Sequence, residues 1–582
     1  MKLKKKIRTL SSNQLIILLF IISVPFVNFN HHYYSKGEGV IKWDVKSYYA
    51  YLPATFIYHD LSLNYRYKYP EKHLKKWIWP IKTPTGKYAI ITSCGLSMLY
   101  SPFFFIAHQY AKISPKYNAD GYSKPYHAAL TFSAYFYFIL ALFILRKILL
   151  RYFNDKTTAL TLFFIGAGTN LFYYITYEAP MPHSYNFFLI ILFLWLLIKW
   201  HEKLNIKNSI FLGLTAGLIA LVRPTNIIVL FLIPFYGVRN LNTLKESINK
   251  LLKHWYLILI TAVFFIIIWI PQFAYWYYVS GKIFYFSYGA EGAHFFFNNP
   301  QITDFLFSYK KGWYVYTPVM LFATFGLYRL FKLKNNLSSG IFIILILNIY
   351  ILSSWWSWWF GGSFGTRSLI DIYGLMAIPL AALIEKKRKI KFEKPIIIIL
   401  LFILTFYNQF QIQQYRKGAI HYWWMNKEAY WTNFMHLHPT CKYWKVIQKP
   451  DYQKARQGIY VSIPVYDKHS EISDSTLKIA VIKDLLKEKY PSDSIESNLK
   501  TYINDSIYIK KAQEITDNKK AGKYFKDLKI EYYKKYINAC ISWRKETEKK
   551  AKNEKISYQQ ALSKEASRVY EKYSQKYEDT FK

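Results

Sequence analysis

The chain has 582 residues, of which 52% are hydrophobic and 20% aromatic, yet its mean hydropathy is only +0.02. A very apolar part must therefore be averaged with a very polar one. The formal charge of +42 would point to a nucleic-acid partner in a soluble protein. Much of the Lys and Arg, however, stands in short loops between apolar runs, which is the pattern that orients membrane proteins, so we expect no nucleic acid to bind.

The cysteines and the N-terminus limit the class further. Cys94, Cys441 and Cys540 lie far apart and show no CxxC or Cys/His spacing, so the sequence predicts neither a disulfide framework nor a zinc site. The basic start, MKLKKKIR, precedes an apolar stretch from Leu15 to Phe29 with no small-residue cleavage site after it. This pattern indicates an uncleaved membrane anchor.

Apolar runs follow one another up to about residue 409. A helix needs about 20 apolar residues to cross a bilayer core about 30 Å thick. Residues 89–113, which contain Gly95, Ser101 and Pro102, are predicted to form an interfacial or re-entrant helix pair. The predicted spans are a hairpin of two short spans within 213–237, broken at Arg223-Pro224, and residues 14–29, 127–145, 158–176, 184–199, 255–277, 313–331, 340–356, 368–384 and 395–409. The predicted fold class is an all-α membrane protein with about 11 transmembrane helices.

The basic loops orient these spans. With the N-terminus inside, the predicted inner loops are rich in Lys and Arg, whereas the short outer turns contain few cations. This is the distribution that the positive-inside bias requires. The long first loop, up to about residue 88, and the tail from residue 410 are therefore predicted to lie on the periplasmic side of the cytoplasmic (inner) membrane.

The tail differs in composition from the membrane part. From residue 475, apolar residues recur three or four positions apart with charges between them, which predicts amphipathic helices. The predicted organisation is a polytopic transmembrane domain at 1–409, a periplasmic linker or extension at 410–474 and a basic, mainly helical domain at 475–582.

The first outer loop contains two carboxylates of interest. Asp44, about 15 residues after the first span, is either a solvated loop carboxylate or helix cap, or a general base that accepts a proton during catalysis. Asp60 stands in the segment HDLSLN, which is typical of a helix N-cap, and is the weaker candidate.

Two further outer turns carry polar residues that lipid would reject. The segment YEAPMPHSYNFF offers Glu178 and His183 on a bend stiffened by proline, and His183 could instead satisfy a helix N-terminus. Arg223 stands at the tip of an apolar hairpin, where a cation must find an anion or the membrane interface. We predict that these three residues bind substrate.

The later outer loops supply more cations. The segment YGAEGAHFFFNNPQITDFLFSYKKGWYVYTP contains Glu291, His294, Lys310 and Lys311, and the lysine pair could instead extend to the interface without a specific partner. We predict substrate contacts for Glu291, Lys310 and Lys311.

The last outer turn, SSWWSWWFGGSFGTRSLID, combines a tryptophan cluster with glycines, Arg367 and Asp371. Tryptophans there could form an ordinary interfacial belt. Arg367 and Asp371 are four residues apart, which on an α-helix places them on one face. The preferred hypothesis is an internal ion pair that directs Arg367 toward a phosphate; the alternative is a purely structural pair.

The acidic first loop, the RPTN hairpin, the FSYKKGWYVYTP segment and the WWFGGSFGTR turn together carry a resemblance to a known architecture. The chain resembles the polytopic C-type glycosyltransferase superfold that includes protein O-mannosyltransferases and lipid A aminoarabinose transferases, and in particular uncharacterised bacterial membrane glycosyltransferases of that type. The resemblance covers about residues 10–440. The paired acidic motif of the O-mannosyltransferases is absent around Asp44, and the first loop has no DxD.

The resemblance implies an inverting transfer from a polyprenyl-phosphate-linked sugar to a glycan, lipid or protein acceptor at the outer membrane face. Asp44 would accept the proton of the acceptor hydroxyl. The cations Arg223, Lys310, Lys311 and Arg367 would bind the leaving polyprenyl phosphate, where fixed charge stabilises the transition state. No cofactor is implied with certainty, and a divalent metal stays possible.

Two other function classes compete with a transferase. A transporter or flippase of lipid-linked saccharide would also need a basic outward cavity, but it should place polar residues at the bilayer midplane and show inverted repeats. The sequence has neither feature. A non-catalytic membrane scaffold would leave Asp44, Arg223 and Arg367 without a common target.

Overall fold

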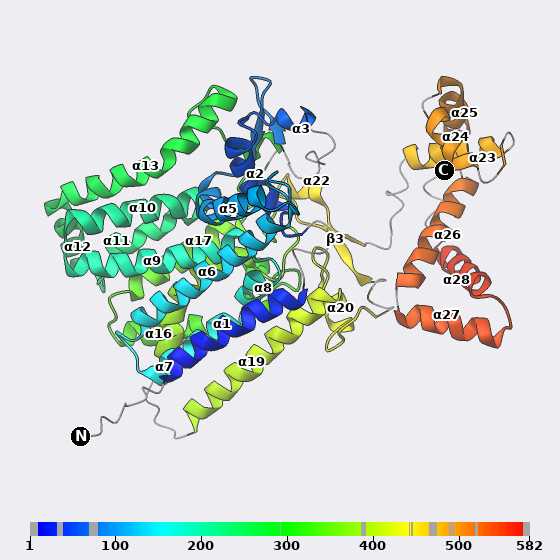
Figure 1. Ribbon diagram of the computed structural model, residues 1–582. Coiled ribbons are helices and arrows are strands. Elements are labelled where there is room, and N and C mark those ends of the chain that lie inside the picture. The colour runs from blue at the N-terminus through cyan, green and yellow to red at the C-terminus, as the bar shows by residue number, and fades with distance from the viewer. Residues whose placement is uncertain are drawn as a thin grey trace, which may run out of the picture. The chain divides into compact units, whose positions relative to one another are not determined.

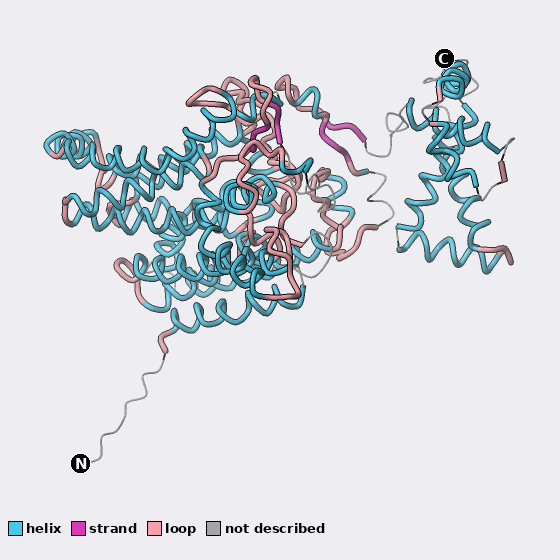
Figure 2. The backbone as a smooth tube through the Cα atoms, turned by 45° about the horizontal axis from the view of Figure 1, so that its top comes forward, coloured by secondary structure: helices cyan, strands magenta, loops and turns pink. Residues whose placement is uncertain are grey.

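The chain divides into two compact units in the computed structural model, residues 1–413 with 452–459 and residues 414–451 with 460–582. The structure describes residues 10–31, 39–68, 80–291, 293–385, 392–440, 443, 446–464, 474–487, 490–491, 494–503, 505–517, 522–539 and 541–573. Almost all regular structure in both units is helical, as Figure 2 shows.

The first unit is a bundle of long helices (Figure 1). Its helices are α1 (Ser12–His31), α2 (Asp44–Phe56), α3 (Tyr65–Lys68), α5 (Gly95–Ile113), α6 (Lys124–Leu149), α7 (Asp155–Ala167), α8 (Leu171–Thr176), α9 (Pro182–Glu202), α10 (Ile206–Val222), α11 (Leu232–Phe235), α12 (Leu241–Lys253), α13 (Trp255–Ser280), α14 (Ile302–Phe307), α15 (Trp313–Tyr316), α16 (Val319–Lys332), α17 (Ser338–Ser353), α18 (Tyr373–Glu385), α19 (Glu393–Arg416) and α22 (Tyr452–Ala455). In the part of the chain that the structure describes, three 3₁₀ helices join them: η2 (Pro224–Phe231), η3 (Ser287–Glu291) and η4 (Arg367–Ile372). Strands β1 (Pro80–Lys82) and β2 (Tyr88–Ile90) pair antiparallel, with Ile81 opposite Ala89.

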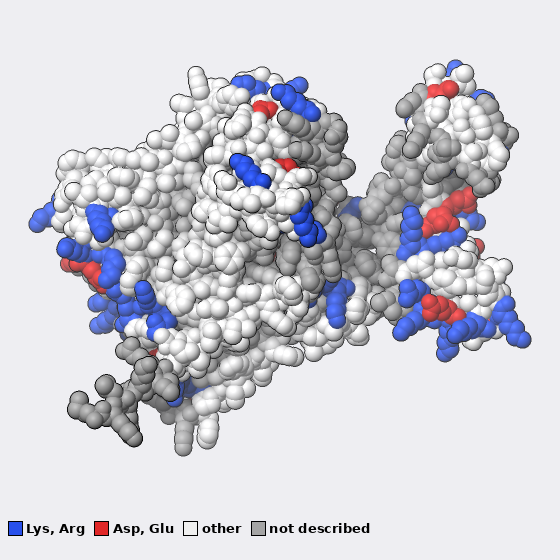
Figure 3. Space-filling model, in the orientation of Figure 1, with Lys and Arg blue, Asp and Glu red and all other residues white. Residues whose placement is uncertain are grey.

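Six helices among the described residues are long and apolar enough to cross a membrane, which supports a multi-pass membrane protein. They are Ser12–Asn30, Lys124–Leu149, Pro182–Glu202, Trp255–Ser280, Arg367–Glu385 and Glu393–Arg416, with shorter apolar helices at Ile206–Val222, Pro224–Phe235 and Ser338–Ser353. Figure 3 shows Lys and Arg gathered near α12 and near α2 and α3, with a largely uncharged face between them. The predicted total of eleven spans stays a prediction.

Three predicted elements differ from the structure. Residues 95–113 form one continuous helix, α5, with Pro102 inside it, so the predicted helix pair is wrong. The predicted span 158–176 breaks into α7 and α8, and 313–331 breaks into α15 and α16. At both breaks, side-chain amides of α19 bind the carbonyl groups that the helices leave free: Asn408 Nδ2 lies 2.6 Å from Tyr316 O, and Gln409 Nε2 lies 2.5 Å from Ala167 O. Broken helices persist in lipid where a neighbour satisfies the backbone in this way.

Small residues let the membrane helices approach closely. Gly213 and Gly217 are four residues apart on α10 and face α13, and a Cβ added to Gly217 would lie 2.6 Å from Phe265 O. A Cβ at Gly213 would collide with Thr261 O. Such spacing of small residues is a common helix contact in membranes, because association there depends on close packing rather than on hydrophobic burial.

The second unit holds two small helical cores. Its elements are α20 (Lys427–Thr432), β3 (Gln448–Pro450), β4 (Ser462–Pro464), α23 (Asp474–Lys487), α24 (Ile495–Tyr502), α25 (Ser506–Asp517), α26 (Gly522–Ala539), α27 (Ile541–Asn553) and α28 (Tyr558–Tyr573). Helices α23, α24 and α25 pack around Val481 and Leu486, and helices α26, α27 and α28 pack around Ile537 and Leu562. The amphipathic pattern after residue 475 therefore forms the helices that it predicts.

Candidate active site

Asp44 is the first residue of α2, where a carboxylate interacts favourably with the positive end of the helix dipole. The preceding residue, Trp43, has a φ of 51°, a left-handed conformation that is uncommon for an aromatic residue. Arg367 Nη2 donates to Asp44 Oδ2 at 2.9 Å. The Asp44 side chain is 42% exposed, against 15% for Arg367. Asp44 is therefore an accessible carboxylate held at one oxygen by a mostly buried guanidinium.

A tight turn delivers Arg367 to Asp44 from far along the chain. The turn includes Gly365, whose φ of 61° favours glycine and whose added Cβ would lie 2.8 Å from Tyr316 Cβ. The 3₁₀ helix η4 begins at Arg367 directly after this turn. The tryptophan-rich segment 353–359 precedes this turn. Backbone hydrogen bonds from Phe296 N to Ser354 O (2.6 Å) and from Trp356 N to His294 O (3.1 Å) join it to the predicted outer loop that contains His294.

Asp371 is a fully buried carboxylate with four donors around it. Arg223 Nη1 lies 2.9 Å from Oδ2 and His183 Nδ1 lies 3.0 Å from Oδ1. The amides of Asn226 and Asn186 donate to Oδ2 at 2.7 and 3.3 Å. A buried charge persists when it is paired and hydrogen-bonded. Asp371 therefore has the environment of a structural anchor for Arg223 and His183.

The histidine in this cluster has one consistent tautomer. A carboxylate can only accept a hydrogen bond, so His183 Nδ1 must carry the proton that bonds Asp371. The Arg223 Nη1 atom, 3.3 Å from the same nitrogen, is then in contact with it without a hydrogen bond.

The position of Arg223 follows from a helix break. Arg223 ends α10 with extended backbone angles, φ −146° and ψ 107°, because the next residue, Pro224, disfavours a helical residue before it. Pro224 then starts η2, which brings Asn226 to the same carboxylate as Arg223. The predicted break at Arg223-Pro224 is present in the structure.

The predicted ion pair between Arg367 and Asp371 is wrong. Arg367 pairs with Asp44, and Asp371 pairs with Arg223 and His183. The prediction assumed an α-helix, in which residues i and i+4 share a face. Residues 367–372 form a 3₁₀ helix instead, with about three residues per turn, so residue i+4 points roughly 120° away from residue i.

Tyr48 connects the two ion pairs. It is buried one helical turn after Asp44 on α2. Burial and the nearby Asp44 together raise the pKa of Tyr48 to about 12, against the opposing effect of the two cations Arg223 and Arg367. All of these charges are therefore close to one phenol group.

Glu178 lies at the edge of the same group. The Tyr173 hydroxyl donates to Glu178 Oε1 at 3.1 Å. Burial raises the pKa of Glu178 above its usual value, and Arg367 and Lys42 oppose the rise, so both cations are near the carboxyl group. The structure thus brings together Asp44, Glu178, His183, Arg223, Arg367 and Asp371 from four separate segments of the chain.

Lys310 and Lys311, which are neighbours in sequence, differ in burial and in the groups that they contact. Lys311 is only 2% exposed, and its ammonium donates to the carbonyl of Ser363. Burial lowers the pKa of Lys311 well below its usual value, and Arg367 lowers it further. The Lys310 Nζ lies 4.8 Å from the ring centre of Trp359, and burial lowers the pKa of Lys310 to about 8. Lys311 therefore fastens the turn that carries Arg367, and Lys310 is the more available cation.

The remaining candidates lie elsewhere or outside the described side chains. Asp60 accepts the backbone N–H groups of Ser62 and Tyr65 at 2.9 Å each, so it caps the start of α3. Glu291 ends η3, and its side chain lies outside the described residues. Among the described residues, no group of three or more His, Cys, Asp or Glu side chains could hold a metal ion.

Sequence reasoning missed three members of the site. Asn226 stands in the RPTN segment and Asn186 in the YEAPMPHSYNFF segment. Both motifs therefore contained the amide, but neither showed that its partner is Asp371. Tyr48 follows Asp44 by four residues, which on an α-helix places both on one side. The sequence signal that could have identified them is a polar side chain within four residues of a candidate charged or titratable residue.

No family model matches the chain, and no curated protein matches it. Similar solved structures include the archaeal oligosaccharyltransferase AglB from Archaeoglobus fulgidus, in complex with an inhibitory peptide and a dolichol-phosphate, at 10% identity and a TM-score of 0.42, covering 84% of this chain and 59% of that one. They also include the apo form of the Archaeoglobus fulgidus oligosaccharyltransferase, at 12% identity and a TM-score of 0.40, covering 74% of this chain and 60% of that one. This chain spans about three fifths of the length of those proteins. A likeness of this degree leaves the function to be argued from the side chains themselves.

Proposed function

We propose that the protein is a membrane glycosyltransferase that moves a sugar from a polyprenyl-phosphate-linked donor to an acceptor at the outer face of the cytoplasmic membrane. One observation carries the proposal: an accessible carboxylate, Asp44, is bound by Arg367 next to a second cation, Arg223, that a buried anchor holds in place. Transfer from a phosphate-linked sugar needs one proton acceptor and fixed positive charge for the leaving group.

The proposed reaction uses each member of the site in turn. The acceptor hydroxyl oxygen attacks the anomeric carbon of the sugar while its proton passes to Asp44. The bond between that carbon and the phosphate oxygen breaks, and polyprenyl phosphate leaves with the electron pair. Attack opposite to the leaving group inverts the anomeric centre.

The cations stabilise the leaving phosphate in this scheme. Arg367 and Arg223 supply planar guanidinium groups, which match phosphate geometry better than a point charge does. Lys310 adds a third cation at the edge of the site, beside the rings of Trp358 and Trp359. The loss of one such contact typically costs about 2.7–4 kcal/mol of transition-state stabilisation.

The buried residues have supporting roles in the proposal. Asp371 and His183 position Arg223, and Glu178 lies where its charge acts on Arg367. Positioning matters for rate, because a displacement of about 1 Å can cost about 10²-fold. The acceptor is a glycan, lipid or protein, and we propose that the second unit lies in the periplasm, where it could meet that acceptor.

The proposal is tested with membranes that contain the protein and a panel of polyprenyl-phosphate sugars. The expected result is release of polyprenyl phosphate with formation of a glycosylated product, and mass spectrometry of glycans from a deletion strain should show the same product missing. Matched membranes without the protein serve as the control. Movement of intact lipid-linked saccharide across the bilayer, without release of polyprenyl phosphate, would favour a transporter instead.

A further inference from the structure

Helix α12 is an amphipathic helix whose apolar face the protein leaves uncovered. Asn240 and Thr243 form a capping box at its N-terminus, in which the side chain of each residue accepts a hydrogen bond from the backbone N–H of the other. No residue of α12 is buried, and Leu241 and Leu252 are 76% and 65% exposed. An exposed apolar face on a helix with basic residues is typical of a helix that lies in the membrane interface.

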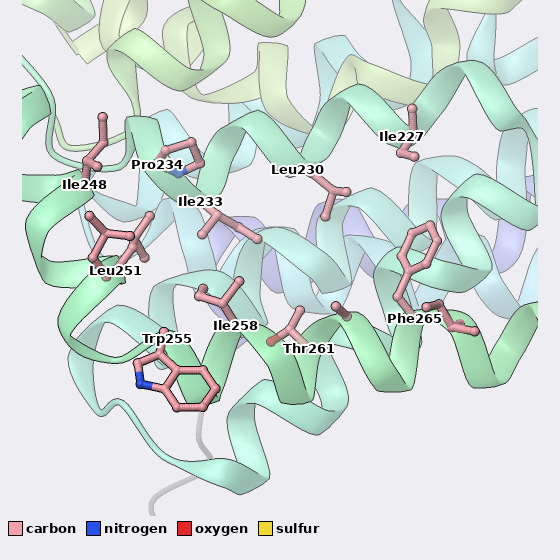
Figure 4. A pocket seen from close by; sticks show the side chains of 13 residues that line it. Ile227, Leu230, Ile233, Pro234, Ile248, Leu251, Trp255, Ile258, Thr261 and Phe265 are labelled. Carbon is pink, nitrogen blue, oxygen red and sulfur yellow. The ribbon is translucent and has the colours of Figure 1, made fainter.

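An apolar groove runs beside this helix. The groove has a volume of about 700 Å³, within the roughly 300–1,000 Å³ of small-molecule sites. Figure 4 shows side chains from η2 and α11, from α12 and from α13 directed toward it, among them Leu230, Ile233, Leu251 and Ile258. Twelve of its thirteen lining residues are apolar, and the hydroxyl of the other, Thr261, donates to Leu257 O at 2.9 Å. The groove therefore suits a hydrocarbon chain.

Helix α12, which lines the groove with Ile248, Leu251 and Leu252, also carries cations. Lys245, Lys250 and Lys253 are exposed on α12, and none of the three has an ion-pair partner among the described residues. Glu246 is the one acidic residue of the helix. Trp255, 62% exposed at the start of α13, both lines the groove and has the amphipathic ring favoured at the interface.

We propose that this groove binds an acyl chain of an anionic phospholipid and that Lys250 and Lys253 bind the phosphate of its headgroup. The apolar lining of the groove matches the acyl chain, and the lysines, which lie within one helical turn of each other on α12, match the phosphate. The site stands apart from the residues around Asp44, and it lies on the side that the basic loops predict to be cytoplasmic, where anionic lipids attract basic segments.

Native mass spectrometry of the full chain released from nanodiscs tests the proposal. Phosphatidylglycerol and phosphatidylcholine with identical acyl chains are compared as probes. Lys250→Gln/Lys253→Gln should reduce the preference for phosphatidylglycerol by about 30-fold at low salt, because each lysine near a charged lipid surface contributes about one kcal/mol. The control, Lys147→Gln/Lys156→Gln, neutralises two exposed lysines of another predicted inner loop and should keep the preference.

A second variant tests the hydrocarbon part of the site. Ala262→Phe fills the groove and should weaken binding of both lipids while leaving the ratio between them unchanged. Equal loss of preference in the control variant would overturn the proposal, because the effect would then be one of overall charge. Retention of full preference in Lys250→Gln/Lys253→Gln, or copurification of a membrane protein that shields α12 in place of lipid, would also overturn it.

Discussion

Asp44 and Asp371 show how environment gives two carboxylates different roles. Asp371 is fully buried and has four donors, whereas Asp44 is 42% exposed and, among the described residues, is hydrogen-bonded by Arg367 alone. A buried charge that loses its partner destabilises a protein strongly, whereas an exposed pair contributes little. These environments favour a structural role for Asp371 and fit the chemical role that we propose for Asp44.

Asp371→Asn should destabilise the membrane unit. The change leaves the Arg223 guanidinium buried without its anion, which costs about 3–5 kcal/mol. Thermal unfolding of the purified protein in detergent should show a clear fall in midpoint. Asp44→Asn serves as the matched control: Arg367 is about as buried as Arg223, but Asp44 is 42% exposed, so water can solvate the guanidinium in place of the carboxylate and the free energy of unfolding should fall by less. Equal midpoints for the two variants would remove the anchor role from Asp371.

Lys310 should make transfer sensitive to alkaline pH. Burial lowers the pKa of Lys310 to about 8, so the ammonium is charged below that pH and loses its charge as the pH rises through it. Transfer should fall over this range in the native protein. Lys310→Arg should move the fall to higher pH, since guanidinium stays protonated. Lys282→Gln, at an exposed position in a predicted outer loop, is the control, and an identical fall in Lys310→Gln would show that another group titrates.

At the scale of elements, composition predicted the long apolar helices but not the places where they break. The spans 14–29, 184–199 and 255–277 became α1, α9 and α13 with slightly wider bounds. The breaks after α7 and α15 depend on amides of α19, more than 80 residues away in sequence, so no local pattern reports them. No local pattern predicted the 3₁₀ form of η4 either, and this form gives Arg367 and Asp371 different partners from those predicted.

Adding even a methyl group at Gly365, in the turn before η4, should lower transfer. Gly365→Ala places a Cβ 2.8 Å from Tyr316 Cβ at a φ of 61°, so the turn must shift and move Arg367. A displacement of about 1 Å should lower transfer about 10²-fold. Gly86→Ala is the control, because Gly86 also has a positive φ, 82°, but nothing lies within 4 Å of the added Cβ. Normal transfer by Gly365→Ala at normal abundance would contradict this role of the turn.

At the scale of the whole molecule, the distribution of basic loops is the main evidence for orientation. The predicted inner loops and α12 carry cations at one end of the bundle, and the residues around Asp44 come from the predicted outer turns (Figures 1 and 3). The Lys/Arg bias of the short loops could predict this division, because that bias orients the spans relative to the membrane. It could not predict which outer side chains meet, since that depends on how the helices pack.

The orientation predicts that the second unit lies outside the cytoplasmic membrane. In a variant without the native cysteines, Ser506→Cys at the start of α25 should react with a membrane-impermeant thiol reagent in intact spheroplasts. Asn249→Cys on the exposed side of α12 should react only after lysis. Reversal of these two results would invert the topology and place the Asp44 site on the cytoplasmic side.

The most direct test of the central claim is the transfer rate of Asp44→Asn in membranes supplied with a polyprenyl-phosphate sugar, at matched protein level. Asparagine keeps the size of the side chain but cannot accept the acceptor's proton. General-base assistance typically contributes about 10²–10⁴-fold, so the account predicts a fall of that order, while Asp60→Asn, at the cap of α3, should change the rate much less. Full activity of Asp44→Asn would contradict the account.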